Sequence, residues 1–544
     1  MQQANKFYQK GKNGIKRKNL NYFAIRMGFV VVYLILLTIL YLAERNVPGS
    51  SIDSFGDAFW FSLVTLSTVG YGDMTPKTPA GYIIGVIFLV MSMGLLLALI
   101  GSVMSFLTSE GFPLLRLSFI RHRNWHYMAD FIAESDALAK NILEEDPDAV
   151  IIYGVNIDEI AERPDYPCFF INVSPAKIAA KKKGIGSKCN VYFLKENEIG
   201  TNLKAVDIYQ QPVNVYACTM SGKEMMSGNI HFFHPYDCCA RSYWRTHPLK
   251  DTENTIVIIG FGNYGEAMLE RAILTNINDS DFDVSYHIFG DYKRFLSIHS
   301  NLSPAFGINE KREGHDSLFF HDEEWTEAHE LMENADRIII CEDKESTGWD
   351  IMWQIQRYYG NKGDIYLRSN RKAPGVSYFG TNDEIFTVDK IIRTKLNYAA
   401  KVMNDLYRRS VETSLDWDEL SDRLKESKIA VADHLYMKVR TLIGRENFPE
   451  LDREISQEAY EAYCEARKDP EELDRLRRIE HERWMRFYCY YNWKYGPVKS
   501  DRLRENPLIC DYDKLSEPQK AYHDRAWELI GEISRLLKER EKFS

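Results

Sequence analysis

Cysteines are few in this chain, and none precedes Cys168. There are nine in all, and no two have the spacing of a CxxC metal-binding pair. The sequence therefore predicts no metal site built from cysteines, and the thiols are expected to be reduced and structural. Low-complexity tracts and long linkers are also missing, so the 544 residues suffice for several folded domains.

Acidic residues are absent from the first 26 positions, which carry seven basic residues. These are Lys6, Lys10, Lys12, Lys16, Arg17, Lys18 and Arg26. The whole chain nevertheless has a net charge of −10, so the remainder is strongly acidic. An acidic body argues against nucleic acid as a partner.

Charged residues are also absent from two long apolar runs, 27–43 and 80–107. At about 1.5 Å per residue, a helix over the second run exceeds a ~30 Å hydrocarbon core. The first run is slightly short, and the aromatic flank with a snorkelling Arg26 extends it. Basic residues flank the runs at their outer ends and are scarce between them, which places both termini in the cytoplasm. The sequence thus predicts a multi-pass protein of the lipid bilayer.

The segment Thr68-Val69-Gly70-Tyr71-Gly72-Asp73 lies between the two runs. Its glycines can turn successive backbone carbonyls toward one axis, where the carbonyls and a threonine hydroxyl replace the water shell of K⁺. A closed ring of carbonyls needs four such loops, so the motif implies a homotetramer. Residues 55–67 predict a short helix whose negative end points at the cation.

This order of helix, short helix, loop and helix resembles the pore of two-transmembrane potassium channels. The resemblance covers 1–112 and implies a K⁺-selective filter at Thr68, Val69, Gly70, Tyr71, Gly72 and Asp73, with no metal beyond the permeant K⁺. It also implies a gating hinge in the second span. We place the hinge at Gly94, with Gly85 and Gly101 as alternatives, because glycine weakens a helix by about 1 kcal/mol relative to alanine.

A second motif begins with the apolar strand 255–259 and continues as Gly260-x-Gly262-x-x-Gly265 into an amphipathic helix. In nucleotide-binding folds these glycines permit a tight turn and a close approach of backbone to phosphate at a helix N-terminus. A following strand ends at Asp291, in place to meet a ribose and to repel a 2′-phosphate. The pattern predicts NAD or an adenine nucleotide on Gly260, Gly262, Asn263, Tyr264, Gly265 and Asp291. The other interpretation is that the glycines only shape the turn.

Strands and helices alternate over 251–412, which predicts a doubly wound α/β fold. This part resembles the RCK (regulator of K⁺ conductance, TrkA-N-like) domain, a Rossmann-type module. Residues 113–250 predict a first copy, with strands at 126–132, 149–153, 168–173, 190–194 and 213–218. Its turn at 133–135 lacks glycine, so we interpret this copy as degenerate. Two copies in each of four chains imply a gating ring of eight domains.

The segment 471–544 follows a helical connector, 413–470, and is rich in aromatic residues. The spaced residues Trp484, Trp493, Tyr495, Pro497, Tyr512 and Tyr522 resemble the RyR (ryanodine-receptor repeat) domain, with Asn506 where that family usually has histidine. A mostly α-helical fold is implied. The candidate ligand residues are His481, Trp484, Tyr488, Trp493 and Tyr495. The alternative is that these rings form a hydrophobic core.

Together these features predict a ligand-gated K⁺ channel of a prokaryotic plasma membrane whose RCK and RyR domains sense small ligands. An NAD-dependent oxidoreductase tethered to the membrane is a second hypothesis, but no candidate base or nucleophile accompanies the glycine loop. A subunit of an RCK-regulated K⁺ transporter is a third, although such chains carry four filter loops and this one carries one. We therefore expect the protein not to be an enzyme.

Overall fold

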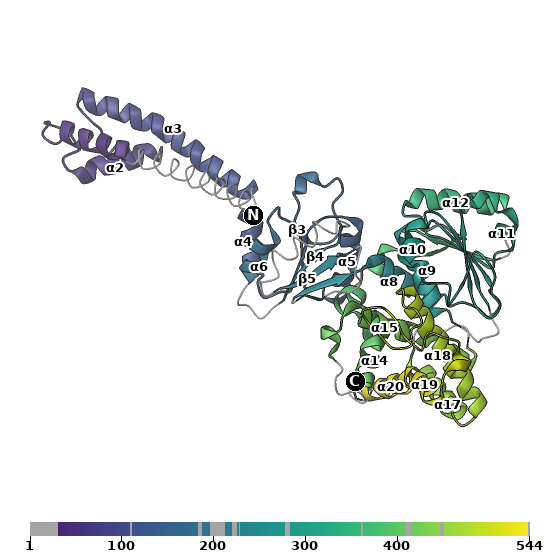
Figure 1. Cartoon of the computed structure of the whole chain (residues 1–544). Helices are drawn as coiled ribbons and strands as arrows, with labels where there is room; N and C mark the ends of the chain where they lie inside the picture. The colour runs from purple at the N-terminus through teal and green to yellow at the C-terminus, as the bar shows by residue number, and fades with distance from the viewer. Residues whose placement is uncertain are drawn as a thin grey trace. The chain divides into compact units, whose positions relative to one another are not determined.

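The computed structural model describes residues 31–108, 111–182, 188–195, 213–219, 226–227, 229–277, 283–360, 363–409, 415–445 and 451–541. The basic N-terminal segment and the first residues of the run 27–43 lie outside these ranges. Internal contacts divide the chain into two compact units, Met1–Arg116 and Leu117–Ser544, which are coloured along the chain in Figure 1.

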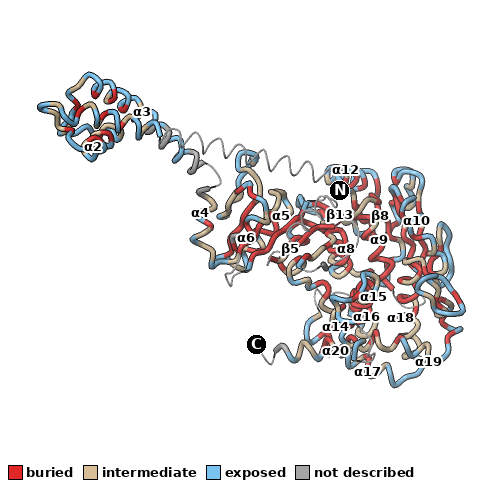
Figure 2. Tube along the Cα trace, turned by 60° about the vertical axis from the view of Figure 1, so that its left-hand side comes forward, coloured by how far each residue is buried: buried red, intermediate tan, exposed pale blue. Residues whose placement is uncertain are grey.

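Helices dominate the N-terminal unit. Residues 31–44 are helical, α2 covers Phe55–Leu66, α3 covers Pro79–Thr108, and α4 (Gly111–Phe119) crosses the boundary between the units. The small buried core consists of Leu37, Leu40, Ile52, Ala58, Ile84 and Phe88. Many other large apolar side chains are exposed, among them Val90 and Leu97 of α3, and Figure 2 shows α3 largely in the exposed colour. Within the described ranges, no helix combines the length and the apolarity needed to cross a membrane.

The second unit contains two sheets, and the first has the strand order β3-β2-β1-β4-β5-β7-β6. All of its pairings are parallel except that of β6 with β7. Its strands are β1 (Trp125–Met128), β2 (Val150–Tyr153), β3 (Cys168–Phe170), β4 (Cys189–Phe193), β5 (Asn214–Cys218), β6 (Met226–Ser227) and β7 (Ile230–Phe233). Its helices are α5 (Ala133–Glu145), α6 (Pro175–Lys182) and α8 (Pro235–Thr246), with a 3₁₀ turn at Ile157–Glu159. Residues 133–135, predicted as a turn, are the first residues of α5, because β1 ends at Met128 instead of residue 132.

The second sheet is parallel throughout, with the order β10-β11-β9-β8-β12-β13-β14. Its strands are β8 (Thr255–Ile259), β9 (Ser285–Phe289), β10 (Gly307–Ile308), β11 (Ser317–His321), β12 (Arg337–Ile340), β13 (Asp364–Arg368) and β14 (Ser377–Phe379). Its helices are α9 (Asn263–Thr275), α10 (Lys293–Ile298), α11 (His329–Asn334), α12 (Glu345–Tyr358) and α13 (Asn382–Ile385). In both sheets the first strand lies between strands that follow it in opposite directions, which is the doubly wound order. The predicted pair of Rossmann-like sheets is confirmed.

Helices form the rest of the chain, and Figure 1 shows them gathered beside the second sheet. They are α14 (Tyr398–Arg408), α15 (Asp422–Asp433), α16 (Leu435–Ile443), α17 (Arg453–Ala466), α18 (Pro470–Tyr490), α19 (Glu517–Lys520) and α20 (Asp524–Glu541). Short 3₁₀ or π turns lie at Trp325–Glu327, Val388–Ile392, Lys395–Asn397, Trp417–Glu419, Tyr512–Lys514 and Ala521–His523. One apolar cluster joins α14–α18 to α20 and includes Leu435, Tyr463 and Trp527.

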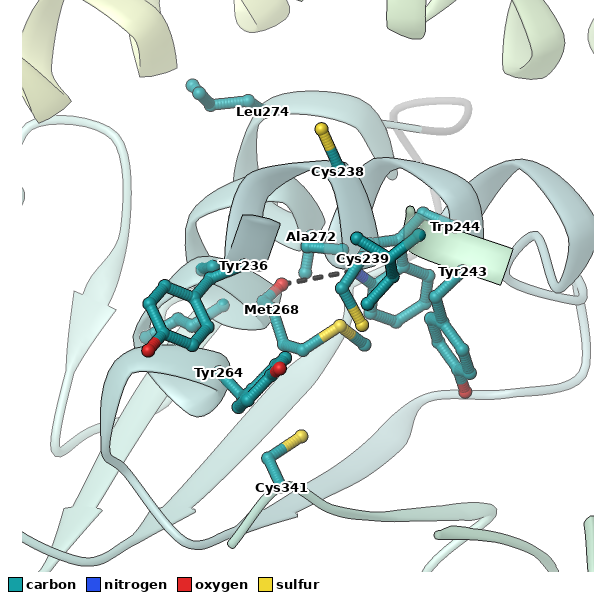
Figure 3. Close-up of a cluster of buried hydrophobic side chains, with 14 of the residues drawn as sticks. Tyr236, Cys238, Cys239, Tyr243, Trp244, Tyr264, Met268, Ala272, Leu274 and Cys341 are labelled. Carbon is teal, nitrogen blue, oxygen red and sulfur yellow. Dashed lines mark hydrogen bonds between the residues drawn. The ribbon is translucent and has the colours of Figure 1, made fainter. Parts of the chain in front are cut away.

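Helix α8 follows the first sheet in sequence but packs on α9 of the second domain. The Trp244 indole Nε1 donates to the Met268 carbonyl at 3.0 Å. Around that hydrogen bond, Figure 3 shows Tyr264, Cys239 and Cys341 within one buried cluster. The proposed boundary at residue 250 therefore separates α8 from the helix against which it packs.

Candidate functional site

The loop that follows α2 alternates in backbone handedness. Thr68, Gly70 and Gly72 have φ values of 60°, 57° and 73°, and Val69 and Tyr71 between them are not in the left-handed region. Alternating handedness reverses successive peptide planes, so consecutive carbonyls can face the same side. A left-handed threonine is rare, because its branched side chain opposes this conformation. Such strain persists where surrounding structure enforces it, and it is common at functional sites.

Helix α2 delivers the chain directly into this loop. Its N-terminus is closed by a capping box between Ser54 and Asp57. At its C-terminal end, the Val64 carbonyl accepts hydrogen bonds from the backbone N–H groups of Val69 and Gly70, at 3.1 and 3.3 Å. The negative end of the helix dipole therefore lies at the start of the loop.

Aromatic contacts hold the outer part of the loop. The Trp60 indole Nε1 donates to Asp73 Oδ2 at 3.0 Å. The same indole lies nearly parallel to the Tyr71 ring, with centroids 6.4 Å apart and 6° between the planes. These contacts fix both ends of the Tyr71–Asp73 segment to α2. Sequence reasoning included Asp73 and Tyr71 but missed Trp60, whose only signal was its place in an aromatic helix.

Glu44 braces the segment that leads from the loop into α3. Its side chain is fully buried. It accepts hydrogen bonds from the Lys77 N–H at 2.9 Å, the Thr78 N–H at 2.8 Å, the Thr78 hydroxyl at 2.6 Å and the Ser50 hydroxyl at 2.8 Å. Sequence reasoning used this residue only as a loop charge, because its partners lie more than 30 positions away.

Gly94 lies within α3, which is helical throughout Pro79–Thr108. A Cβ atom added at Gly94 would meet nothing within 4 Å, and the same holds at Gly101, whereas at Gly85 it would contact Phe61. Packing within the single chain therefore does not require glycine at position 94. Its role as a hinge stays a prediction.

The glycine loop between β8 and α9 is as tight as its sequence predicts. Gly260 has a φ of 88°, and a Cβ there would lie 2.8 Å from the Glu342 backbone nitrogen. A Cβ at Gly262 would collide with the Asp343 carboxylate, and one at Gly265 with the Gly260 carbonyl oxygen. Each of the three positions therefore requires glycine on steric grounds alone.

Acidic residues lie on both sides of this loop. Strand β8 pairs with β9 on one side and with β12 on the other, so Asp291 and the Glu342–Asp343 pair follow at the same carboxyl edge. Burial and the neighbouring charges of Asp343 and Glu324 raise the pKa of Glu342. An incoming phosphate is attracted by the N-terminus of α9 and repelled by these carboxylates. The edge matches the place where ligands bind in doubly wound sheets.

A buried arginine lies beside the loop at the end of β13. The Arg368 guanidinium lies 4.1 Å from the centroid of the Tyr264 ring and donates to its hydroxyl at 2.8 Å. Its Nε atom is buried and has no hydrogen-bond partner among the described residues. Sequence reasoning named Asn263 and Tyr264 but missed Arg368, since only the sheet register brings it to the loop.

Aromatic rings fill the equivalent position in the first sheet. Phe131, which follows β1, packs edge-on against Tyr153 and Phe170, with centroids 4.9 and 5.6 Å away. Adding a Cβ at Gly154 would collide with Tyr127, so this edge is also closely packed. This packing agrees with the interpretation of the first copy as degenerate.

The candidate ligand residues of the C-terminal segment divide into buried and exposed groups. Trp484 and Trp493 are 7% and 2% exposed, and the ring of Tyr488 lies between them, 4.2 and 5.0 Å from theirs. His481 is buried and its Nε2 hydrogen-bonds the Cys510 carbonyl at 2.8 Å, whereas Tyr495 is 61% exposed. The structure thus brings four of the five together in a packed aromatic core and leaves Tyr495 outside it.

Residues 28–109 match the family model described as "Ion channel". This part of the chain is an ion-channel pore region. Among curated proteins, the Shal voltage-gated potassium channel of Drosophila melanogaster is 45% identical over 67 residues, which are 11% of this chain and 12% of that protein. The voltage-gated potassium channel of Aeropyrum pernix is 43% identical over 75 residues, or 13% and 25%. The calcium-gated channel TvoK of Thermoplasma volcanium is 36% identical over 81 residues, or 15% and 23%.

The chain therefore spans a quarter or less of the length of these relatives, and all three matches are to potassium channels rather than to enzymes. Two solved structures were also found. GsuK bound to ADP covers 68% of this chain and 96% of its own, at 14% identity and a TM-score of 0.33. The GsuK channel bound to NAD covers 70% and 86%, at 12% identity and a TM-score of 0.32.

Proposed function

We propose that the chain is one subunit of a homotetrameric, K⁺-selective channel whose α/β and C-terminal domains sense small ligands. The observation that carries the proposal is the alternating backbone of Thr68, Gly70 and Gly72 at the C-terminal end of α2. A loop of this geometry supplies a column of carbonyl oxygens, and four copies around one axis replace the hydration shell of K⁺.

The exposed apolar side chains of the N-terminal unit support assembly within a lipid bilayer. Val69 and Tyr71 are 53% and 69% exposed in the single chain, and α3 exposes apolar residues along its length. Contiguous exposed apolar surface of this kind is a feature of interfaces with other subunits or with lipid. In the proposed tetramer, neighbouring loops cover the filter residues and lipid covers the outer faces of the helices.

The nucleotide part of the proposal rests on the glycine loop of the second sheet. The steric need for glycine at 260, 262 and 265, the N-terminus of α9 and the unpartnered Nε of Arg368 all favour an anionic group there. Asp291 at the same edge favours a ribose with a free 2′-hydroxyl, and hence NAD or an adenine nucleotide. The aromatic segment around His481, Trp484, Tyr488, Trp493 and Tyr495 belongs to the proposed second sensor.

The decisive experiment is ion flux into liposomes that contain the full-length protein. We expect uptake of K⁺ down a gradient and exclusion of Na⁺ under the same conditions. Flux should be abolished by a pore-blocking quaternary ammonium ion. Equal uptake of Na⁺ and K⁺ would overturn the channel proposal, whatever the ligand domains bind.

A further inference from the structure

Two cationic side chains share one aromatic ring in the helical C-terminal part of the chain. The ammonium of Lys428, on α15, lies 3.7 Å from the centroid of the Tyr407 ring of α14. The guanidinium of Arg525, on α20, lies 5.2 Å from the same centroid. Cation–π attraction offsets part of the cost of holding these charges at a partly buried place, but it does not neutralise them.

A third cation lies close to this pair. Arg483, on α18, is 2% exposed. Its Nε and one terminal nitrogen bind Glu480 at 2.8 Å, while the other terminal nitrogen is buried with no hydrogen-bond partner among the described residues. Burial and the charges of Arg525 and Arg483 lower the pKa of Lys428 to about 8, with no carboxylate acting against them. The three cations are therefore near enough to repel one another.

The carboxylates of the same helices already have other partners. Glu480 bonds to Lys438 at 2.7 Å as well as to Arg483. Asp524 receives both arms of Arg477, at 2.6 and 2.7 Å. Glu426 bonds to Arg271 at 3.0 Å. Among the described residues, no acid forms an ion pair with Lys428 or Arg525, so the cluster carries excess positive charge.

The cluster is open on one side. Tyr522, which is 49% exposed, precedes Arg525 by one turn, and the charge of Arg525 lowers the pKa of its phenol against the opposing effect of burial. On the far side, Arg423 lies 5.0 Å from the Trp493 ring centroid and only 3.9 Å from Asp501. A small ligand can therefore reach the cations beside a tyrosine ring instead of crossing the buried tryptophans.

We propose that Lys428, Arg483 and Arg525 bind the phosphate group of a small anionic ligand, at a site separate from the glycine loop. Arginine and lysine donors converging on one point suit a phosphate, which accepts several charge-assisted hydrogen bonds at once. The bound anion neutralises the excess charge and joins α15, α18 and α20. This proposal deepens the proposed second sensor of the chain, and it moves the ligand from the buried indoles to the adjacent basic cluster.

The test is calorimetric titration of the full-length, detergent-solubilised protein with sodium pyrophosphate, and in parallel with AMP. Both titrations use the Gly262→Asp background, so that the glycine loop contributes little. We expect saturable binding of pyrophosphate. The double variant Lys428→Met/Arg525→Gln should weaken that binding by about tenfold or more, because charged hydrogen bonds are lost. The matched controls are Lys428→Arg, which keeps the charge, and Lys499→Met, which removes an exposed lysine elsewhere; both should bind normally.

The two probes separate the sources of the phosphate. Tighter binding of AMP than of pyrophosphate would assign the site to nucleotides, with Tyr522 against the base, and the reverse would assign it to inorganic or sugar phosphates. Absence of saturable binding of both probes, or unchanged affinity in the double variant, would overturn the proposal. If the double variant melts below the wild type, loss of binding counts only when Lys428→Arg/Arg525→Lys, with both charges kept, restores it. Because no readout involves ion flux, failure here is distinguishable from failure of the channel proposal.

Discussion

Gly70 illustrates how one residue determines the geometry of the pore loop. Its φ of 57° is accessible to glycine at little cost, whereas an alanine there is strained. We expect Gly70→Ala to abolish selective K⁺ uptake into liposomes without preventing tetramer formation, as judged by size-exclusion chromatography with light scattering. Gly56→Ala, which adds the same methyl group within α2 at ordinary contact distance, should leave uptake intact. Selective uptake by Gly70→Ala would contradict the filter assignment.

Gly262 plays the corresponding part in the glycine loop. A side chain at this position collides with Asp343, and an aspartate adds a third carboxylate to the edge. Gly262→Asp should therefore weaken binding of NAD or ADP by about tenfold or more in calorimetry. Gly360→Asp adds the same charge at a glycine with open space around it, and it should bind normally. Equal affinity in all three proteins would mean that the glycines only shape the turn.

At the residue scale, the sequence predicts local chemistry better than long-range partners. The filter and the three glycines are recognisable because their backbone demands are encoded within a few neighbouring positions. Glu44 and Arg368 were not assigned a role, since the first meets Lys77 and Thr78 and the second meets Tyr264 only in the folded chain. No periodicity along the chain marks such a pairing.

Among the elements, α3 is the one whose flexibility the proposed gating requires. Replacing Gly94 by alanine stabilises a straight helix by about 1 kcal/mol, which corresponds to roughly a fivefold shift between a straight and a bent state. If the open pore needs a bend there, Gly94→Ala should lower the open probability by about that factor in single-channel recordings. A Cβ at Gly94 meets nothing within 4 Å in the single chain, so a steric effect within the subunit is not expected. An unchanged open probability would exclude Gly94 as the hinge.

Element type follows well from the sequence, but element boundaries and packing do not. The helix expected over 471–491 is α18, Pro470–Tyr490, because its apolar residues recur with helical spacing. The expectation that this helix belongs to a separate hairpin misses its partners. Tyr490 stacks on His299 with centroids 3.9 Å apart, and Arg486 bonds to Asp316 at 2.6 Å. Those contacts join α18 to the second α/β domain, and no local pattern encodes them.

At the scale of the second unit, a buried ionic network links α8, α9 and α15. Asp433 bonds to Arg241 and Arg245, each at 2.7 Å, and Arg271 bonds to Asp237 at 2.6 Å. Asp433→Asn leaves two arginines without their carboxylate in a buried place, which typically costs about 3–5 kcal/mol. We expect a lower melting temperature by differential scanning calorimetry. Asp405→Asn, at an exposed position on α14, should melt like the wild type, and a similar result for Asp433→Asn would show that the network contributes little.

Acid should destabilise the same unit through its buried histidines. Burial lowers the pKa values of His126, His287 and His434 to about 4 from the ordinary value of 6.5. The unfolded chain then binds more protons than the folded one between these values, so stability is present above about pH 6.5 and is lost as the pH falls toward 4. The melting temperature should decline across this window. His126→Gln should reduce the slope, whereas His329→Gln, at an exposed site, should not.

The position of α8 has a consequence for how the protein can be divided. A fragment that stops after the first sheet, near residue 250, retains Arg241 but loses Asn397 and Asp433, which bind its guanidinium at 2.7 Å. A fragment that begins near residue 251 loses Asp237, the partner of Arg271. Neither half of the α/β region can therefore be excised cleanly, and expression of the soluble part should begin near Leu117 and continue through α20. The evolutionary corollary is that the two sheets are expected to be inherited, duplicated and exchanged together with the helices behind them, as a single cassette.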